Sequence, residues 1–175
     1  GCAAVGFTIY PGSDYQYDMI EEFKEISFEA SEAGLPSVLW SYPRGPNIDK
    51  KSETSIDIIA YAAHIAALLG AHIIKVKPPS SSVTNSELKK QYSNFLSNIE
   101  SLEERIKHIK KSAFNSKKIV VFSGGNAKGT KEMLEEIEQI KNGGGNGSII
   151  GRNTFQRPRE EALQLLQSVI NIYKK

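Results

Sequence analysis

Two lysines at the end of a short apolar segment are the residues in this sequence best suited to chemistry. Residues 70–79 read Gly-Ala-His-Ile-Ile-Lys-Val-Lys-Pro-Pro, a pattern typical of a buried strand bounded by glycine and proline. Residues two apart in a strand share a face, so we expect Lys75 and Lys77 to point the same way. Burial and a neighbouring like charge both favour the neutral amine, the form that attacks a carbonyl carbon. The pair therefore indicates a Schiff-base lysine, and two solvated lysines at a strand end are the alternative.

The composition is that of an ordinary globular protein. The 175 residues are 39% apolar and 24% charged, with a formal net charge of +2 at pH 7. This small and scattered charge argues against nucleic acid or a membrane as partner. The chain has no apolar run of about 18 residues, and its single cysteine, Cys2, excludes an intrachain disulfide. We therefore expect a cytoplasmic protein.

Strand-like and helix-like segments alternate along the chain. Apolar segments predict strands at residues 3–10, 36–42, 70–77, 118–122 and 148–150. Helical spacing of apolar residues predicts helices at 14–33, 55–69, 99–113, 130–141 and 160–173, the second capped by Ser55. Residues 80–98 are polar and are interpreted as an insertion.

This alternation predicts a parallel sheet with helical crossovers. The sheet could be open and doubly wound, or it could be an arc of an eight-stranded (β/α)8 TIM barrel. A full barrel needs roughly 250 residues, so the chain would hold about five of the eight βα units. Its start in a strand-like segment agrees with a missing N-terminal portion.

Five short motifs occur in order at ordinary βα spacing. They are GFTIYPGS at residues 6–13, LWSYPRG at 39–45, IIK at 73–75, SGG at 123–125 and IGRN at 150–153. Together they resemble the archaeal and bacterial type of class I fructose-bisphosphate aldolase, the DhnA-like aldolase family, over essentially the whole chain. The resemblance implies a TIM barrel, with residues 1–175 as the C-terminal part of a single domain that covers strands four to eight. It also implies reversible cleavage of fructose 1,6-bisphosphate in glycolysis and gluconeogenesis.

Within this resemblance, Lys75 matches the Schiff-base lysine and Tyr42 the tyrosine that shuttles protons to and from the substrate hydroxyl. Trp40 matches the residue that shapes the pocket around the sugar chain, although an isolated tryptophan there would more often fill a core. Lys77 is given a supporting role, because its charge would help to keep Lys75 neutral. The alternative for Lys77 is a solvated lysine at the rim.

The same resemblance implies a site for the substrate's phosphates. Barrels frequently bind phosphate with the loops after the last two strands, where glycine lets backbone N–H groups approach the anion. Arg44 could bind the distal phosphate through its guanidinium, or it could be a surface arginine in a turn. The expected phosphate-binding residues are Arg44, Ser123, Gly124, Gly125, Gly151 and Arg152. Plain turns are the alternative for both glycine motifs.

No metal or other cofactor is expected. His64, His72 and His108 show no ligand spacing, and a lysine imine does the electron-sink work that a metal ion does in other aldolases. The family also has an acidic residue at the end of its first barrel strand, and the present chain has no such strand. We therefore expect an open sheet whose inner face carries Lys75, Lys77, Trp40 and Tyr42 more exposed than in a working enzyme, and unpaired edges that favour a homo-oligomer.

Two other function classes stay open at this point. Relatives in the same family run other lysine-dependent chemistry on phosphorylated substrates, including a transaldolase-like step. A non-catalytic phosphosugar-binding module is the second class, and it would form no covalent adduct with its ligand.

Overall fold

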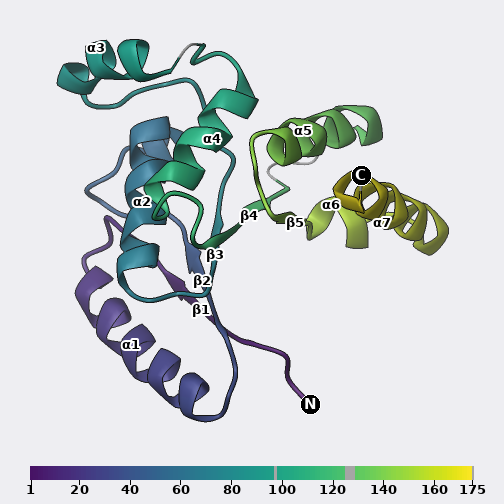
Figure 1. Cartoon of the computed structure of the whole chain (residues 1–175), viewed down its shortest axis with the longest axis horizontal. Coiled ribbons are helices and arrows are strands. Elements are labelled where there is room, and N and C mark those ends of the chain that lie inside the picture. The colour runs from purple at the N-terminus through teal and green to yellow at the C-terminus, as the bar shows by residue number, and fades with distance from the viewer. Residues whose placement is uncertain (97, 125–128, 175) are drawn as a thin grey trace.

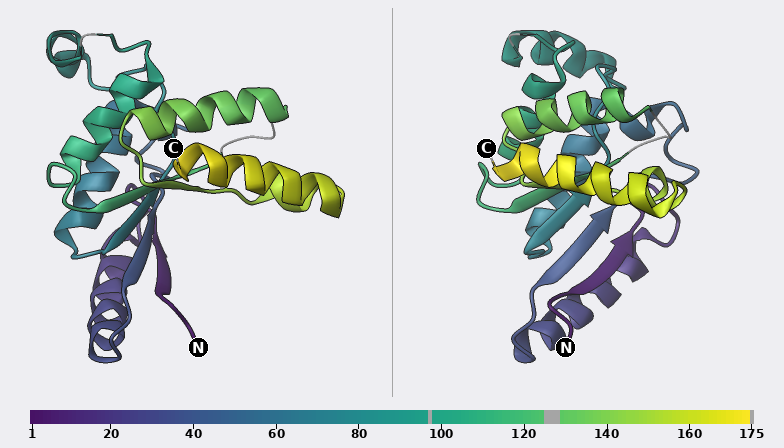
Figure 2. Two further views of the ribbon diagram at one scale, coloured as in Figure 1. Left: turned by 45° about the vertical axis from the view of Figure 1, so that its right-hand side comes forward. Right: turned by 90° about the vertical axis from the view of Figure 1, so that its right-hand side faces the viewer.

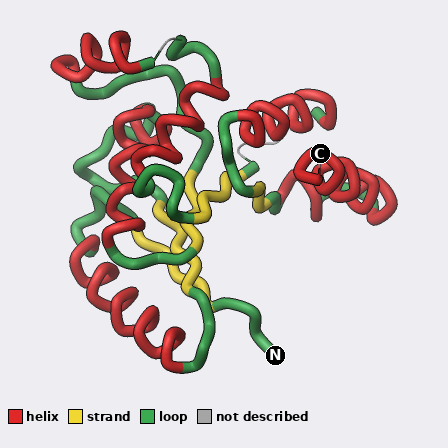
Figure 3. Tube along the Cα trace, in the orientation of Figure 1, coloured by secondary structure: helices red, strands yellow, loops and turns green. Residues whose placement is uncertain are grey.

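A parallel β-sheet runs through the centre of the computed structural model, which describes residues 1–96, 98–124 and 129–174 (Figure 3). The strands are β1 (Val5–Ile9), β2 (Ser37–Ser41), β3 (Ile73–Val76), β4 (Ile119–Ser123) and β5 (Gly147–Ile149). Each strand pairs in parallel with the next one along the chain, in the order β1-β2-β3-β4-β5. The order follows the sequence without reversal, which fits an arc of a barrel and not a doubly wound sheet.

Helices cover the outer side of this curved sheet. They are α1 (Gln16–Glu32), α2 (Ile56–Leu68), α3 (Ser86–Phe95), α4 (Leu102–Ser112), α5 (Thr130–Asn142), α6 (Arg152–Phe155) and α7 (Arg159–Lys174), with a short 3-10 helix η1 (Ser52–Thr54). Figures 1 and 2 show α1, α2, α4, α5 and α7 following one another around the arc, and α4 packs on both α2 and α5. The described residues include no helix that is long and apolar enough to cross a membrane.

The alternating direction of side chains along each strand separates the two faces of the sheet. The face toward the helices carries the buried apolar residues Ile9, Leu39, Ile74, Val76, Val120 and Phe122. The opposite face lines the inside of the arc. One level of the strand register forms a row on that face, made of Thr8, Trp40, Lys75, Val121 and Gly147. Lys75 and Trp40 are therefore neighbours on the face that a closed barrel would enclose.

The polar segment at residues 80–98 contains a helix, α3, that the sequence analysis does not predict. Asn85 caps this helix, because its side-chain oxygen accepts a hydrogen bond from the backbone N–H of Glu87 at 2.9 Å. Tyr92 of α3 is buried, and its hydroxyl lies 3.1 Å from Nε2 of His108 on α4. The insertion is therefore packed against the outer helices.

The start of α2 is also tied to this insertion. Ser55 lies at the N-cap position, as predicted, but its side chain does not cap the helix. Its hydroxyl lies 2.9 Å from the hydroxyl of Ser82 instead. The Asp57 carboxylate accepts hydrogen bonds from the backbone N–H groups of Thr84 and Asn85 at 3.0–3.1 Å. The insertion thus holds the helix that follows the loop carrying Tyr42 and Arg44.

Candidate active site

Lys75 lies on the inner face of β3 and is buried, with only 8% of the residue exposed. The Lys75 side chain is thus covered within the arc itself. Among the described residues the ammonium group has no hydrogen-bond or ion-pair partner, and Nζ lies 5.6 Å from the centroid of the Trp40 ring. Burial lowers the pKa of Lys75. The site therefore favours the neutral, nucleophilic amine.

Trp40 lies on β2 between the lysine and the edge strand β1. Its indole reaches across to Gly6, where a Cβ atom would lie only 2.4 Å from Cζ3 of the ring. The residues on either side of Trp40 face the other way, since Leu39 is in the helix-side core and Ser41 donates a hydrogen bond to the Ala62 carbonyl of α2 at 2.9 Å. Trp40 is thus held on the inner face with Lys75.

Tyr42 follows β2 directly and extends its pairing, because its backbone N–H donates to the Ile9 carbonyl at 3.1 Å. Burial raises the pKa of the Tyr42 phenol, while a hydrogen bond with the Ser123 side chain opposes this rise. The nearby Tyr10 raises the pKa further and Arg44 lowers it, both by smaller amounts. Tyr42 and Ser123 are therefore in contact across the rim of the sheet.

Lys77 has a different environment from Lys75. Its ammonium forms an ion pair with the carboxylate of Glu53 in η1, at 2.7 Å. Burial, and not the charge of Lys77, is the cause of the lowered pKa of Lys75. The supporting role that the sequence analysis assigns to Lys77 stays a prediction, and in the structure a carboxylate compensates the charge of Lys77 at close range.

Arg44 lies in a loop that is locked to the loop after β1. Its guanidinium lies over the Tyr10 ring, 5.4 Å from the centroid, and its backbone N–H donates to the Pro11 carbonyl at 2.9 Å. The next residue, Gly45, has a φ of 139°, and a Cβ there would lie 2.2 Å from the Gly12 carbonyl oxygen. Only glycine allows this close approach. Tyr10 is a site residue that the sequence analysis misses, although its spacing from Thr8 puts it on the inner face.

The loops after β4 and β5 lie side by side. The Asn153 side chain is buried, and its amide donates a hydrogen bond to the Gly124 carbonyl at 3.1 Å. Gly151 directly precedes the short helix α6, whose first residue, Arg152, is exposed. Gly125, the remaining predicted phosphate-binding glycine, lies outside the described residues. The structure thus brings Gly124 close to the IGRN motif, and it adds Asn153 as the residue that links the two loops.

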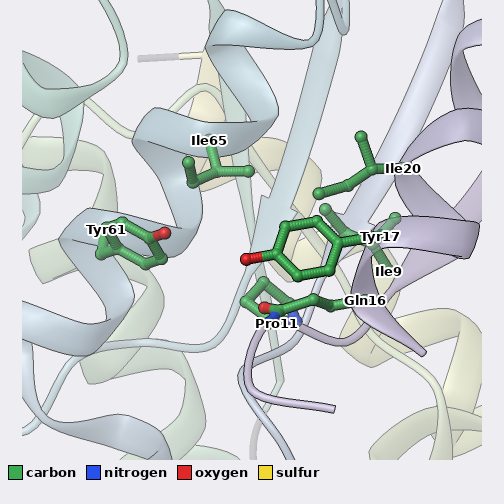
Figure 4. A pocket seen from close by; sticks show the side chains of 7 residues that line it. All are labelled: Ile9, Pro11, Gln16, Tyr17, Ile20, Tyr61 and Ile65. Atoms are coloured by element: carbon green, nitrogen blue, oxygen red, sulfur yellow. The ribbon is translucent and has the colours of Figure 1, made fainter. Parts of the chain in front are cut away.

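A separate cavity of about 160 Å³ lies between α1 and α2, on the helix side of the sheet (Figure 4). Figure 4 shows the hydroxyl groups of Tyr17 and Tyr61 directed toward each other across it. Ile9, which belongs to the helix-side core, forms part of its wall. The cavity is therefore not part of the Lys75 site. In the part of the chain that the structure describes, no group of three or more His, Cys, Asp and Glu side chains could hold a metal ion.

The fold and the site together define a (β/α) barrel domain, present as an arc of five units, with a buried lysine on its inner face. The chain belongs to the DeoC/LacD family of aldolases, whose family model matches residues 1–157.

Two relatives are similar to this chain in sequence. The chain is 34% identical over 169 residues to the fructose-bisphosphate aldolase/6-deoxy-5-ketofructose 1-phosphate synthase of Methanocaldococcus jannaschii, covering 96% of this chain and 47% of the relative. It is 35% identical over 171 residues to a class 1 fructose-bisphosphate aldolase of Halobacterium salinarum, covering 97% of this chain and 56% of the relative. The chain thus spans about half the length of these relatives.

A solved structure is similar over the whole chain. It is an archaeal fructose-1,6-bisphosphate aldolase with its catalytic lysine covalently bound to the carbinolamine intermediate of the substrate. The TM-score is 0.79 at 31% sequence identity, and the match covers 100% of this chain and 59% of that one. This neighbour is a TIM barrel, in agreement with the predicted fold class.

The Tyr42–Ser123 contact leads to a prediction about the phenol. Replacing Ser123 by alanine removes the hydrogen bond that stabilises the phenolate, which is the largest influence opposing burial, so the pKa of Tyr42 should rise. NMR titration of ring-labelled tyrosine, with the signal assigned through Tyr42→Phe, measures this change. Ser148→Ala is the matched control, because Ser148 lies 2.8 Å from the hydroxyl of Tyr173 instead and should leave Tyr42 unaffected. An unchanged Tyr42 titration in Ser123→Ala would contradict the contact.

Proposed function

We propose that this chain is the C-terminal part of a class I fructose-bisphosphate aldolase, with Lys75 as the Schiff-base lysine. The observation that carries the proposal is the buried Lys75 ammonium, which contacts Trp40 and has no carboxylate partner among the described residues. The similar proteins support the reaction class, since two of them are named as fructose-bisphosphate aldolases and a third holds a lysine-bound intermediate. Lysine imine chemistry needs no metal ion or other cofactor.

The reaction starts with attack of the neutral Lys75 amine on the ketone carbon, C2, of fructose 1,6-bisphosphate. Loss of water from the carbinolamine gives a protonated imine, which draws electrons from the C3–C4 bond as it breaks. Glyceraldehyde 3-phosphate leaves and an enamine remains. Protonation of the enamine at C3 and hydrolysis of the imine then release dihydroxyacetone phosphate and restore Lys75.

Tyr42 exchanges the proton of the C4 hydroxyl in this scheme. Its raised pKa keeps the phenol protonated at neutral pH, which is the donor form required in the condensation direction. In the cleavage direction the phenolate is the acceptor, and the hydrogen bond with Ser123 stabilises that form. Trp40 covers the lysine and forms one wall of the space for the sugar chain.

The phosphate-binding part of the proposal rests on the paired loops after β4 and β5. Ser123, Gly124 and Gly125 in one loop, with Gly151 and Arg152 in the other, would bind the phosphate on C1 through backbone N–H groups and the guanidinium. The Asn153–Gly124 hydrogen bond keeps the two loops within reach of one anion. Arg44 would bind the second phosphate from the opposite side of the rim, and its stacking on Tyr10 supports a fixed guanidinium position.

The chain would correspond to strands four to eight of the barrel, as one domain with the insertion at residues 80–98. Five βα units and the coverage of about half of each relative support this assignment. The missing units would then close the barrel over Lys75. The edges of β1 and β5, which have one neighbouring strand each among the described elements, also support self-association of the isolated chain in the cytoplasm.

A second candidate function is lysine-dependent synthesis of another phosphorylated ketose. This second function is supported by the name of the Methanocaldococcus jannaschii relative, because that name includes 6-deoxy-5-ketofructose 1-phosphate synthase. Both activities would use the same lysine and phosphate loops, so parallel assays with the two phosphorylated substrates distinguish them.

Covalent trapping tests the proposed role of Lys75. In the full-length protein, borohydride reduction in the presence of dihydroxyacetone phosphate should label Lys75, and Lys75→Ala should abolish labelling and lower turnover by several orders of magnitude. Peptide mass spectrometry identifies the modified residue. Lys77→Ala is the matched control, since Lys77 is paired with Glu53 and should not form the adduct. Labelling of Lys77 in place of Lys75 would contradict the assignment, and no adduct at all would favour a binding module.

The phosphate site is tested by non-covalent binding in the Lys75→Ala background, where imine formation does not contribute. Adding Arg152→Ala should weaken the binding of dihydroxyacetone phosphate about tenfold, because one charge-assisted hydrogen bond is lost. Isothermal titration calorimetry measures the dissociation constants. Arg159→Ala, an exposed arginine at the start of α7, is the control and should bind as the background does. Equal affinity in the Arg152 and Arg159 variants would remove Arg152 from the site.

The completeness of the barrel is tested by complementation. Aldolase activity of the 175-residue chain alone should be weak or undetectable, because the acidic residue of the first strand and the rest of the wall are absent. Addition of a polypeptide that holds the first three βα units should restore activity, measured by coupled oxidation or reduction of a nicotinamide cofactor. Full activity from the 175-residue chain would show that those units are dispensable.

A further inference from the structure

Gly6 on the edge strand β1 has no side chain, yet it borders the Trp40 ring of the Lys75 site closely. A Cβ atom added at residue 6 would lie 2.4 Å from Cζ3 and 2.9 Å from Cη2 of Trp40. Both atoms belong to the six-membered ring of the indole. The edge of the ring therefore occupies the place of a side chain at residue 6, a space that only glycine leaves open.

Backbone conformation does not explain this glycine. Gly6 lies within β1, pairs with Val38 of β2, and does not have the positive φ found at Gly12, Gly34 and Gly45. An alanine could adopt the same backbone without strain. The constraint at residue 6 is thus the volume of the Trp40 ring alone.

The other side of the indole meets Lys75. Trp40 pairs with Lys75 in the strand register, and Nζ lies 5.6 Å from the ring centroid. The ring is thus confined between the backbone of Gly6 on one strand and the lysine side chain on the other. A methyl group at residue 6 would therefore force the indole to shift from the position in which it lies beside Lys75.

We propose that Gly6 is a positioning residue for the Schiff-base lysine, which acts by leaving room for the Trp40 indole to cover the Lys75 ammonium. This inference rests on the proposed role of Lys75 and extends it to a residue that contacts neither substrate nor lysine. With the indole displaced, water reaches Nζ and the protonated amine is stabilised. Gly6→Ala should therefore raise the pKa of Lys75 toward its ordinary value and slow imine formation.

The first readout does not depend on any substrate. Trp40 is the single tryptophan of the 175-residue chain, so its fluorescence reports on this site alone. Emission should titrate with pH as the nearby ammonium loses its proton, and Lys75→Met should abolish that titration. In Gly6→Ala the titration should move to higher pH. No Lys75-dependent titration in the parent chain, or the same midpoint in Gly6→Ala, would overturn the proposal.

The second readout is the rate of borohydride trapping with dihydroxyacetone phosphate. In Gly6→Ala the initial rate at pH 7 should fall about tenfold and recover as the pH rises, because the neutral fraction of the amine is what changes. The matched control is Gly147→Ala, a strand glycine whose added Cβ would meet only Val121 at an ordinary 3.4 Å, and it should behave as the parent chain. A loss in Gly6→Ala that persists at high pH would overturn the proposal.

A double-mutant cycle separates positioning from general damage to the fold. Trp40→Phe removes the ring atoms that crowd residue 6, so Gly6→Ala should have no further effect on trapping in that background. The double variant also keeps the test valid if Gly6→Ala alone folds poorly. An undiminished effect of Gly6→Ala in the Trp40→Phe background would show that the glycine does not act through the indole. If the parent chain forms no adduct even in the full-length protein, the proposed aldolase function fails, while the fluorescence titration still decides the role of Gly6.

Discussion

One-sided coverage of a pleated parallel sheet is the constraint on which this structure depends. Helices pack on one face only, so alternate residues of every strand enter an apolar core and the residues between them line the inside of the arc. On β3 this alternation places Ile74 and Val76 on the helix side of the sheet and Lys75 on the inner face. The lysine is thereby placed beside Trp40, where an aromatic face covers it and no carboxylate of the described residues pairs with its ammonium. A shift of one residue in the β3 register would move the amine into the helix-side core and empty the site.

Much of this architecture is accessible from the sequence. The alternation of strand and helix patterns predicts a parallel sheet, and the strand order in the structure confirms the barrel arc over the doubly wound alternative. The fourth and fifth strands differ from their predicted positions by one residue each. The alternation of side chains along a strand also predicts that Trp40 and Tyr42 share a face, because they are two positions apart.

What the sequence does not predict depends on contacts between distant segments. The ion pair between Lys77 and Glu53 joins residues that no local pattern relates, and it changes the environment of a lysine that seemed equivalent to Lys75. Helix α3 is polar enough to resemble a loop, although Asn85 followed by Glu87 carries the signal of a capped helix. Tyr10, Asn153 and Gly6 lie within recognisable motifs, but their roles become visible only when neighbouring strands and loops are in place.

The agreement between strand order and chain order has a consequence for how the protein is made. From β2 to β5, each described strand pairs with the strand synthesised just before it, and α4 packs on α2, which precedes it in the chain. This part of the sheet is therefore built from neighbours in sequence, which shortens the loops that folding must close. Growth from one end leaves the newest strand as a template for the next at every stage. The molecule can thus assemble in the direction of translation, one βα unit upon another.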